Sequence, residues 1–423
     1  MSESWSGLLV EVELGAPGHG GFCVARHDGR VMFVRHGLPG ERVLAKVTED
    51  RGKSFCRADA VEILTPSKDR VEAVCPISGP GGSGCCDYSH ASLEAGRAMK
   101  ASVVAEQLRR VAGIEREVLV EELPGTGDGR GWRTRVRLAV DAGGRPGFHR
   151  YRSSSILTEL GCPQMDSLAY EGLSDTRWRA GSELQVVMDG SGERHVVEIA
   201  PAQVSDTGRR SPGRRGASAR RAASSRTRPE KAVIGSGRVT EYVSNRSWTL
   251  DATGFWQAHR GAAQMYTDVV TEWADASPGE GAWDLYGGVG VFAAALAAGV
   301  GSDGHVSSVE FSRRAAEDGR SALVDLPQVS FVPGRVERSL EALAQPVSVA
   351  VLDPPRAGAG RGVIDALAVR RPRSVVHVGC DPASFARDVS LYRAAGYELT
   401  DIRAFDAFPL TSHVECIGRF VRR

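Results

Sequence analysis

The sequence lacks long apolar runs, is poor in aromatic residues and carries almost no net charge. Only 6% of its 423 residues are aromatic, and 53 basic residues nearly balance 52 acidic ones. No segment reaches the ~18 consecutive apolar residues that a membrane span needs. The first residues, MSESWSGLLVEVELG, show no basic start followed by a long apolar stretch, unlike a secretory leader. These absences argue against a membrane protein and predict a cytoplasmic one.

Eight cysteines are present, and their grouping predicts a metal site. The cytosol keeps thiols reduced, so clustered cysteines in such a chain indicate metal binding or catalysis rather than disulfides. Four thiolates suit zinc or an iron–sulfur cluster, and the spacing by itself does not choose between them. The candidate ligands are Cys75, Cys85, Cys86 and Cys162.

Three stretches of the chain differ in pattern and predict three domains. Residues 1–65 contain four or five short strands separated by turn residues, which is typical of a small β-barrel. Residues 66–251 combine the cysteines with a helix at 90–113, expected to pack on the last domain, and further strands. Within them, 206–231 is rich in arginine, serine and glycine, which predicts a flexible basic loop. That loop is either an RNA-binding arm or a tolerated insertion.

From residue 252 to residue 423, strand-like and helix-like segments alternate. GAWDLYGGVGVFAAALAAGV is a strand, a glycine-rich turn and a helix, and VSVAVLDPPRAGAG and PRSVVHVGCDPASFARD repeat the theme. Alternating units of this kind imply a parallel sheet with helices on both faces. The predicted fold class is therefore α/β, with a Rossmann-like domain after the barrel and a mixed α+β central domain.

The glycine-rich turn WDLYGGVG predicts a cofactor pocket. Glycines such as Gly288 allow a ligand to approach the backbone, and the following helix offers free N–H groups. The spacing is not the Gly-x-Gly-x-x-Gly of a dinucleotide site. The next strand ends in Glu310, where a carboxylate can accept hydrogen bonds from ribose hydroxyls. A glycine-rich turn alone is more often structural, but together with Glu310 it favours an S-adenosylmethionine pocket.

Two further strand ends carry groups suited to catalysis. Asp353 ends the strand VAVL, and Cys380 ends SVVHVG just before a helix that begins near Pro382. Buried structural roles are the ordinary explanation for a single Asp or Cys. A helix N-terminus, however, lowers the pKa of a thiol, so Cys380 is a candidate nucleophile. His413 or Glu415, before the last strand, is a candidate base.

These motifs, in this order, resemble the RNA uracil-C5 methyltransferases, which make 5-methyluridine in tRNA and rRNA. The resemblance rests on DLYGGVGVF, VLDPPRAGA, GCDPASFARD and HVECI, and it covers nearly the whole chain. The segment GGFCVARHDGRVMFVRHGLPGERV is similar to a TRAM domain, a small RNA-binding barrel. The resemblance implies methyl transfer from S-adenosylmethionine to uridine C5 through a covalent cysteine adduct at C6.

The resemblance also implies roles for individual residues. It makes Cys380 the nucleophile, Glu415 the general base, and Asp353 a residue beside both cofactor and target base. The implied cofactor contacts are Gln257, Tyr286, Gly288, Val291, Glu310 and Asp353.

The cysteine segment departs from the family pattern. Many members carry Cys-Pro…Cys-Gly-Gly-Cys…Gln-His, which implies a [4Fe–4S] cluster; here the segment is CPISGPGGSGCCDYSHAS. Cys75 and Cys86 match the first and third cysteines and Cys162 the distal fourth, but Ser83 stands at the second position. Cys85, at a usual glycine, either replaces the missing ligand or leaves a weakened three-cysteine site.

Two other interpretations stay open. Asp-Pro-Pro also resembles the Asp/Asn-Pro-Pro motif of N-methyltransferases, which need no thiol. A non-catalytic RNA-binding protein would use only the barrel and the basic loop. The main interpretation predicts an RNA partner, tRNA or rRNA, no membrane association and a monomeric enzyme.

Overall fold

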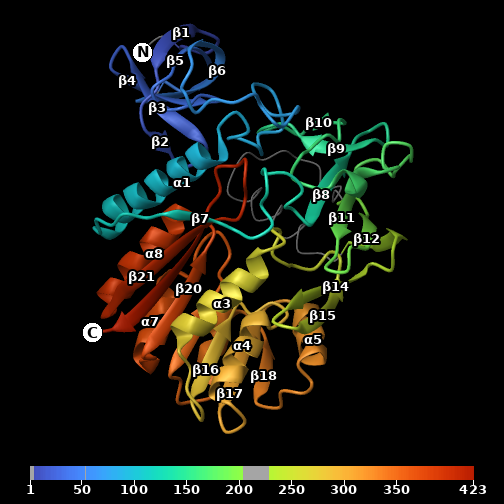
Figure 1. The fold of residues 1–423 in the computed structure, drawn as a ribbon, viewed down its shortest axis with the longest axis vertical. Helices are drawn as coiled ribbons and strands as arrows, with labels where there is room; N and C mark the ends of the chain where they lie inside the picture. Colours follow the sequence, from blue (N-terminus) through green and yellow to red (C-terminus); the bar gives the residue numbers. More distant parts are fainter. Residues whose placement is uncertain (1–3, 53, 203–227) are drawn as a thin grey trace, which may run out of the picture.

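A computed structural model describes residues 4–52, 54–202 and 228–423. A small sheet of strands β1–β6 lies at one end of the molecule, and an eight-stranded sheet flanked by helices lies at the other (Figure 1). A second six-stranded sheet and a short hairpin lie beside them. The predicted α/β class is confirmed by this arrangement.

The first sheet runs in the order β1-β5-β6-β4-β3-β2. Its inward side chains alternate with outward ones along each strand, as expected for a pleated sheet with one buried face. Register shifts between β5 and β6 bend the long β6 strand. The strands are β1 (Leu9–Glu13), β2 (Pro17–Gly18), β3 (Phe22–His27), β4 (Arg30–Arg35), β5 (Arg42–Asp50) and β6 (Phe55–Thr65).

The helix predicted at 90–113 is α1 (Leu93–Gln107), continued by a π-helical turn at Leu108–Ala112. Ser92 caps its start and Gly113, at φ +64°, follows its end. Its apolar side chains join the core around α8 (Pro382–Ala394) of the last domain. The predicted packing of this helix is therefore present.

The second sheet and the hairpin fill the middle of the chain. The sheet order is β10-β9-β8-β11-β12-β13. Of the predicted basic loop 206–231, residues up to 227 lie outside the described ranges, whereas Lys231 belongs to β13 and not to a loop. The elements are β8 (Arg135–Val140), β9 (Pro146–His149), β10 (Ile156–Leu157), the 3₁₀ turn Ser167–Tyr170, β11 (Glu183–Met188), β12 (Arg194–Ile199), β13 (Glu230–Ile234), β14 (Arg238–Val243) and β15 (Arg246–Asp251).

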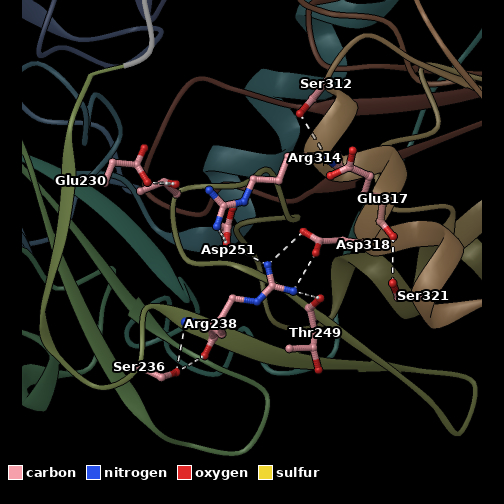
Figure 2. Close-up of polar contacts among 12 residues, drawn as sticks. Glu230, Ser236, Arg238, Thr249, Asp251, Ser312, Arg314, Glu317, Asp318 and Ser321 are labelled. Carbon is pink, nitrogen blue, oxygen red and sulfur yellow. Dashed lines mark hydrogen bonds and ion pairs between the residues drawn. The ribbon is translucent and has the colours of Figure 1, made fainter.

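An ion-pair network fixes the β14–β15 hairpin on α5 (Arg313–Ala322). Figure 2 shows the Arg238 guanidinium between two carboxylates, those of Asp251 at 2.8 Å and Asp318 at 2.7 Å. Arg314 of α5 also contacts Asp251. The network sets the path of the chain that leaves β15.

The eight-stranded sheet has the order β18-β17-β16-β19-β20-β22-β21-β7. Strands β16 to β20 are mutually parallel, and β22 runs antiparallel to both β20 and β21. The strands are β7 (Val120–Glu122), β16 (Gly281–Leu285), β17 (His305–Glu310), β18 (Val329–Pro333), β19 (Val349–Leu352), β20 (Ser374–Gly379), β21 (Tyr397–Asp406) and β22 (Glu415–Arg422).

Helices cover both faces of this sheet, so its central strands are buried apolar runs. One core contains side chains of α3, α4 and α5, and the other those of α1, α6, α7 and α8. The remaining elements are α3 (Ala262–Ala274), α4 (Val291–Val300), α6 (Val336–Ser339), the 3₁₀ turn Leu340–Ala342 and α7 (Gly360–Arg370).

Candidate active site

The carboxyl edge of the eight-stranded sheet brings the predicted site residues together in a row. The sheet order places β17, β16, β19, β20 and β22 side by side. Glu310 ends β17, Asp353 follows β19, Cys380 follows β20 and Glu415 begins β22. Because Gly379 pairs with Cys416 across antiparallel strands, the next residues, Cys380 and Glu415, face each other.

Cys380 is half-buried, between the end of β20 and the start of α8. Burial, with the nearby carboxyls of Glu415 and Asp353, raises the pKa of Cys380 to about 12, while Arg356 opposes this. The expected lowering of its pKa by the helix N-terminus is therefore wrong for the protein as it stands. Desolvation and two negative neighbours outweigh the partial charge of the helix end. The resting thiol is protonated.

Asp353, which is half-buried, and Glu415, which is buried, form a pair of interacting carboxyls. Burial raises the pKa of Asp353 to about 7. Burial and the charge of Asp353 raise the pKa of Glu415 well above its usual range. Two neighbouring carboxyls that repel each other favour a state in which one of them keeps its proton. This site therefore has a group that can accept or release a proton.

His413, the alternative candidate base, differs from Glu415 in its surroundings. Burial and nearby cations, first of all Arg356, lower the pKa of His413 to about 4. Its Nε2 lies 3.4 Å from a guanidinium nitrogen of Arg356. The imidazole is neutral and lies beside that cation, whereas Glu415 begins the strand that pairs with the end of β20 and its charge acts on Cys380.

The cofactor motif forms an open cradle at the ends of β16 and β17. Glu310 accepts hydrogen bonds from the backbone N–H of Gly288 at 3.0 Å and of Ser312 at 2.6 Å. Gly288 has φ +56°, and a Cβ added there would meet nothing within 4 Å. Val291 is the first residue of α4, so the free N–H groups of that helix begin at the same place.

Tyr286 and Gln257, two further predicted cofactor contacts, contact other parts of the fold. Tyr286 has φ +64°, and its ring packs into the core that contains α8. Gln257, on the chain that leaves β15, points its Nε2 at Asp353 Oδ2, 3.3 Å away. The hairpin network of Figure 2 therefore fixes the segment from which Gln257 reaches the carboxyl pair.

Three functional candidates were not found from the sequence. Arg356, an exposed residue of the Asp-Pro-Pro-Arg turn, supplies the positive charge near Cys380 and Glu415. Tyr266 on α3 is buried beside Glu415, and its hydroxyl has no hydrogen-bond partner among the described residues. Tyr266 looks like a core aromatic in the sequence, so no local signal identifies it.

The third, Asp388 on α8, ties the Asp353 turn to the helix that follows Cys380. It is completely buried and accepts hydrogen bonds from the N–H groups of Ala359 at 2.7 Å and Gly360 at 3.3 Å. A Cβ at Gly358 would lie only 2.3 Å from its Oδ2, so this turn needs glycine. The last residue of the GCDPASFARD stretch thus couples the loop that carries Asp353 to the helix that follows Cys380.

The four predicted metal ligands gather in one place in the fold. The sulfurs of Cys85 and Cys86 lie 3.8 Å apart, and hydrogen bonds from Cys162 and Cys86 lower the pKa of Cys85. Ser83 Oγ is 3.3 Å from the Cys85 sulfur. In the part of the chain that the structure describes, no set of three or more His, Cys, Asp or Glu side chains is arranged to hold a metal ion. The predicted [4Fe–4S] cluster therefore finds no support here.

Comparisons with known proteins agree with this architecture. A family model described as the TRAM domain matches residues 6–61, which confirms the expected barrel. An uncharacterized RNA methyltransferase of Corynebacterium glutamicum is 39% identical over 426 residues, 98% of this chain and 97% of its own. Another, from Streptomyces coelicolor, is 42% identical over 439 residues, 97% of this chain and 92% of its own. The chain belongs to the RNA methyltransferase family.

The fold of this RNA methyltransferase is also similar to a solved structure. The tRNA (uracil-54, C5)-methyltransferase of Pyrococcus abyssi, in complex with S-adenosyl-L-homocysteine, matches with a TM-score of 0.69. It covers 97% of this chain and 100% of its own at 20% identity, a likeness of fold. Within residues 4–52, 54–202 and 228–423, no helix of the RNA methyltransferase has the length and apolar character needed to cross a bilayer.

Proposed function

We propose that this RNA methyltransferase transfers a methyl group from S-adenosylmethionine to C5 of a uridine in tRNA or rRNA. The observation that carries the proposal is the row of groups along one sheet edge. Glu310 lies on the cofactor side, Asp353 in the middle, and Cys380 and Glu415 at the other end. That order would place a methyl donor and a nucleophile on opposite sides of one target base.

The cradle fits S-adenosylmethionine in its donor set. Glu310 keeps acceptor capacity for ribose hydroxyls after its two backbone hydrogen bonds, and Gly288 leaves open space beside it. Gln257, Tyr286 and Val291 would complete the contacts. The bound cofactor supplies an electrophilic methyl group on a sulfonium sulfur.

The chemistry follows from the poor nucleophilicity of uracil C5. The Cys380 sulfur bonds to C6 after giving up its proton, and the C5–C6 electron pair moves into the ring as an enolate. C5 would then bond to the methyl carbon as the C–S bond of the sulfonium breaks, with S-adenosylhomocysteine as the leaving group. Glu415 removes the remaining proton from C5, and the electrons of that C–H bond reform the double bond and expel the Cys380 thiolate. The net change replaces one C5 hydrogen by a methyl group and releases one proton.

Because the pKa of Cys380 is high, the charge of the carboxyl pair also affects how readily the thiol loses its proton. A protonated thiol has to lose its proton as it attacks, and two carboxylates at full charge would oppose the resulting anion. If Glu415 and Asp353 share a proton, the negative charge facing the sulfur is halved. The positive charge of the Arg356 guanidinium also lowers the pKa of Cys380.

RNA containing 5-fluorouridine tests the proposal. Fluorine at C5 cannot leave as a proton, so the adduct stays on the protein. We expect a protein–RNA complex that resists denaturation, depends on S-adenosylmethionine and is absent from Cys380→Ala. An N-methyltransferase of the Asp-Pro-Pro type would instead leave Cys380→Ala active. Failure to trap an RNA that the enzyme demonstrably methylates would refute the cysteine adduct.

We also propose that the enzyme acts as a monomer in the cytoplasm, since one chain supplies every group named here. Mapping 5-methyluridine by mass spectrometry in cellular RNA, with and without the gene, would identify the tRNA or rRNA target. A sedimentation experiment that found only dimers would contradict the monomer.

A further inference from the structure

The loop between β21 and β22, residues 407–414, leads directly into Glu415, and we call it the base loop. Its first half is anchored by Lys100 of α1, whose Nζ donates a hydrogen bond to Phe408 O at 3.0 Å. Its second half, which decides where Glu415 begins β22, has to be held by other contacts. Two of these come from the stretch CPISGPGGSGCCDYSHAS, residues 75–92, which we call the cysteine segment.

The first contact is made by Leu410 in the middle of the base loop. The backbone N–H of Tyr88 donates a hydrogen bond to Leu410 O at 2.9 Å. The Leu410 side chain is only 4% exposed and lies in a cluster with buried residues of the cysteine segment, namely Cys75, Ile77 and Cys86. The backbone and the side chain of one loop residue are therefore both held by the same segment.

The backbone of Leu410 is also strained. Its φ is +66°, in the left-handed region that a residue with a large side chain rarely adopts. Such a conformation persists only where the surrounding structure determines it, and strain of this kind is found close to functional sites. If the contacts with the cysteine segment were lost, the base loop would relax toward an ordinary backbone conformation, and the start of β22 would move with it.

The second contact is made by Asp87, the neighbour of Cys86 in the chain. Its Oδ2 accepts a hydrogen bond from Ser412 Oγ at 3.2 Å, and its Oδ1 accepts one from the guanidinium of Arg35 on β4. Asp87 and Arg35 are both buried. A buried carboxyl is costly unless its partners are in place, so this carboxyl favours the arrangement that joins barrel, cysteine segment and base loop. Ser412 lies only three residues before Glu415.

We propose that the cysteine segment positions the general base, and that Asp87, Leu410 and Ser412 are positioning residues for Glu415. The proposal rests on the proposed function for the role of Glu415. The two contacts hold the base loop in its strained conformation, and this keeps the Glu415 carboxyl near Cys380, where it removes the proton from C5. The three residues act on the reaction through Glu415.

Hydrogen exchange tests the hold on the base loop without any substrate. Ser412→Ala removes the hydrogen bond to Asp87 and leaves the Arg35 ion pair, whereas Leu410→Ala removes the buried side chain. We expect the amides of residues 407–414 to exchange about tenfold faster in each variant, measured by mass spectrometry of peptides. Ser412→Thr, which keeps the hydroxyl, and Ser321→Ala on α5 are the controls and should exchange normally. Unchanged exchange in the peptides of β16–β20 checks that each variant is folded.

Alkylation of Cys380 by iodoacetamide reports where the Glu415 charge lies. At an alkaline pH at which the carboxyls are ionised, labelling should be faster in Ser412→Ala and Leu410→Ala, by up to about tenfold, because the charge moves away from the sulfur. In a Glu415→Gln background the same substitutions should add nothing, since that charge is already absent. With RNA and S-adenosylmethionine, we expect kcat to fall about tenfold, KM for the methyl donor to stay constant and a covalent protein–RNA complex to accumulate.

Three results separate the possible failures. Normal exchange of the base loop in both variants would overturn the proposal. So would faster alkylation in the Glu415→Gln background, because it would show a general loosening around Cys380 rather than a displaced Glu415. If the unsubstituted protein never methylates RNA but exchange and alkylation change as expected, the cysteine segment does position Glu415 and only the proposed function fails.

Discussion

Replacing Glu415 by glutamine tests the electrostatics of the candidate site most directly. Glu415 is only 3% exposed, begins β22 and faces Cys380 across the antiparallel pair. Glutamine keeps the size and the hydrogen-bonding capacity of the side chain but removes its charge and its basicity. The substitution should therefore favour thiolate formation and block the last step of the reaction.

The expected magnitude follows from the pKa of Cys380, which is about 12. At pH 8 a thiol of this pKa is thiolate in about one molecule in 10⁴. At a pH high enough to ionise both carboxyls, losing one of the two repelling charges should lower the pKa of Cys380 and raise its thiolate fraction by about tenfold. The loss of the base should slow release of the methylated adduct by about 10²–10⁴-fold. The two effects act in opposite directions on the two halves of the reaction.

Alkylation and adduct accumulation measure these effects separately. Iodoacetamide labelling of Cys380, followed by peptide mass spectrometry at an alkaline pH at which both carboxyls are ionised, should be about tenfold faster in Glu415→Gln. With RNA and S-adenosylmethionine, the same variant should accumulate a covalent protein–RNA complex. Glu398→Gln, on the exposed side of β21, should match the unsubstituted enzyme in both assays. Alkylation no faster than normal, with no complex accumulating, would refute the reasoning.

Three other predictions concern stability, pH and metal. Lys100→Ala should lower the free energy of unfolding in urea by about 3–5 kcal/mol, because it leaves the carboxyl of Asp406 buried without its cation. A Lys100→Met, Asp406→Leu double variant should be nearly as stable as the unsubstituted protein. Equal losses of stability in the two variants would contradict this. The rate should rise with pH through about 7, because a base has to lose the proton held by Asp353 and Glu415. The free energy of unfolding should fall as the pH rises over ~4–7, because the native carboxyl pair keeps protons that the unfolded chain releases. Asp353→Asn should flatten the pH dependence of both the rate and the stability. Unchanged pH dependence in this variant would argue against an interacting pair. Ser83→Cys should raise the iron bound per chain, measured after anaerobic purification, since it adds a fifth thiol to the group, beside Cys85. An unsubstituted protein that already binds a full complement of iron would contradict this.

Much of the architecture is visible in the sequence because it depends on local patterns. The alternation of apolar strands and helices after residue 252 indicates a sheet that is buried on both faces. Turn residues mark the end of each strand. Cys380, Asp353 and Glu310 could be named in advance for that reason. The TRAM barrel was likewise predictable from short strands with inward and outward side chains alternating.

The sequence did not predict how these residues affect one another. The expectation that a helix N-terminus would lower the pKa of Cys380 considered one local effect. Only the folded sheet brings Glu415 near Cys380, buries the carboxyl and half-buries the thiol, and this reverses the shift of the Cys380 pKa. The positions of Tyr266 beside Glu415 and of Asp388 beside Ala359 were not predicted for the same reason, since each pair is far apart in the chain.

The sequence by itself determined which chemical groups this protein has and on which strand ends they lie, because strands, turns and helix starts follow from neighbouring residues. Tertiary structure alone decided which groups share a proton, which cysteines meet and how the barrel faces the nucleophile. Those outcomes depend on strand order and desolvation, which join residues such as His19 and Asp381 that lie 362 positions apart.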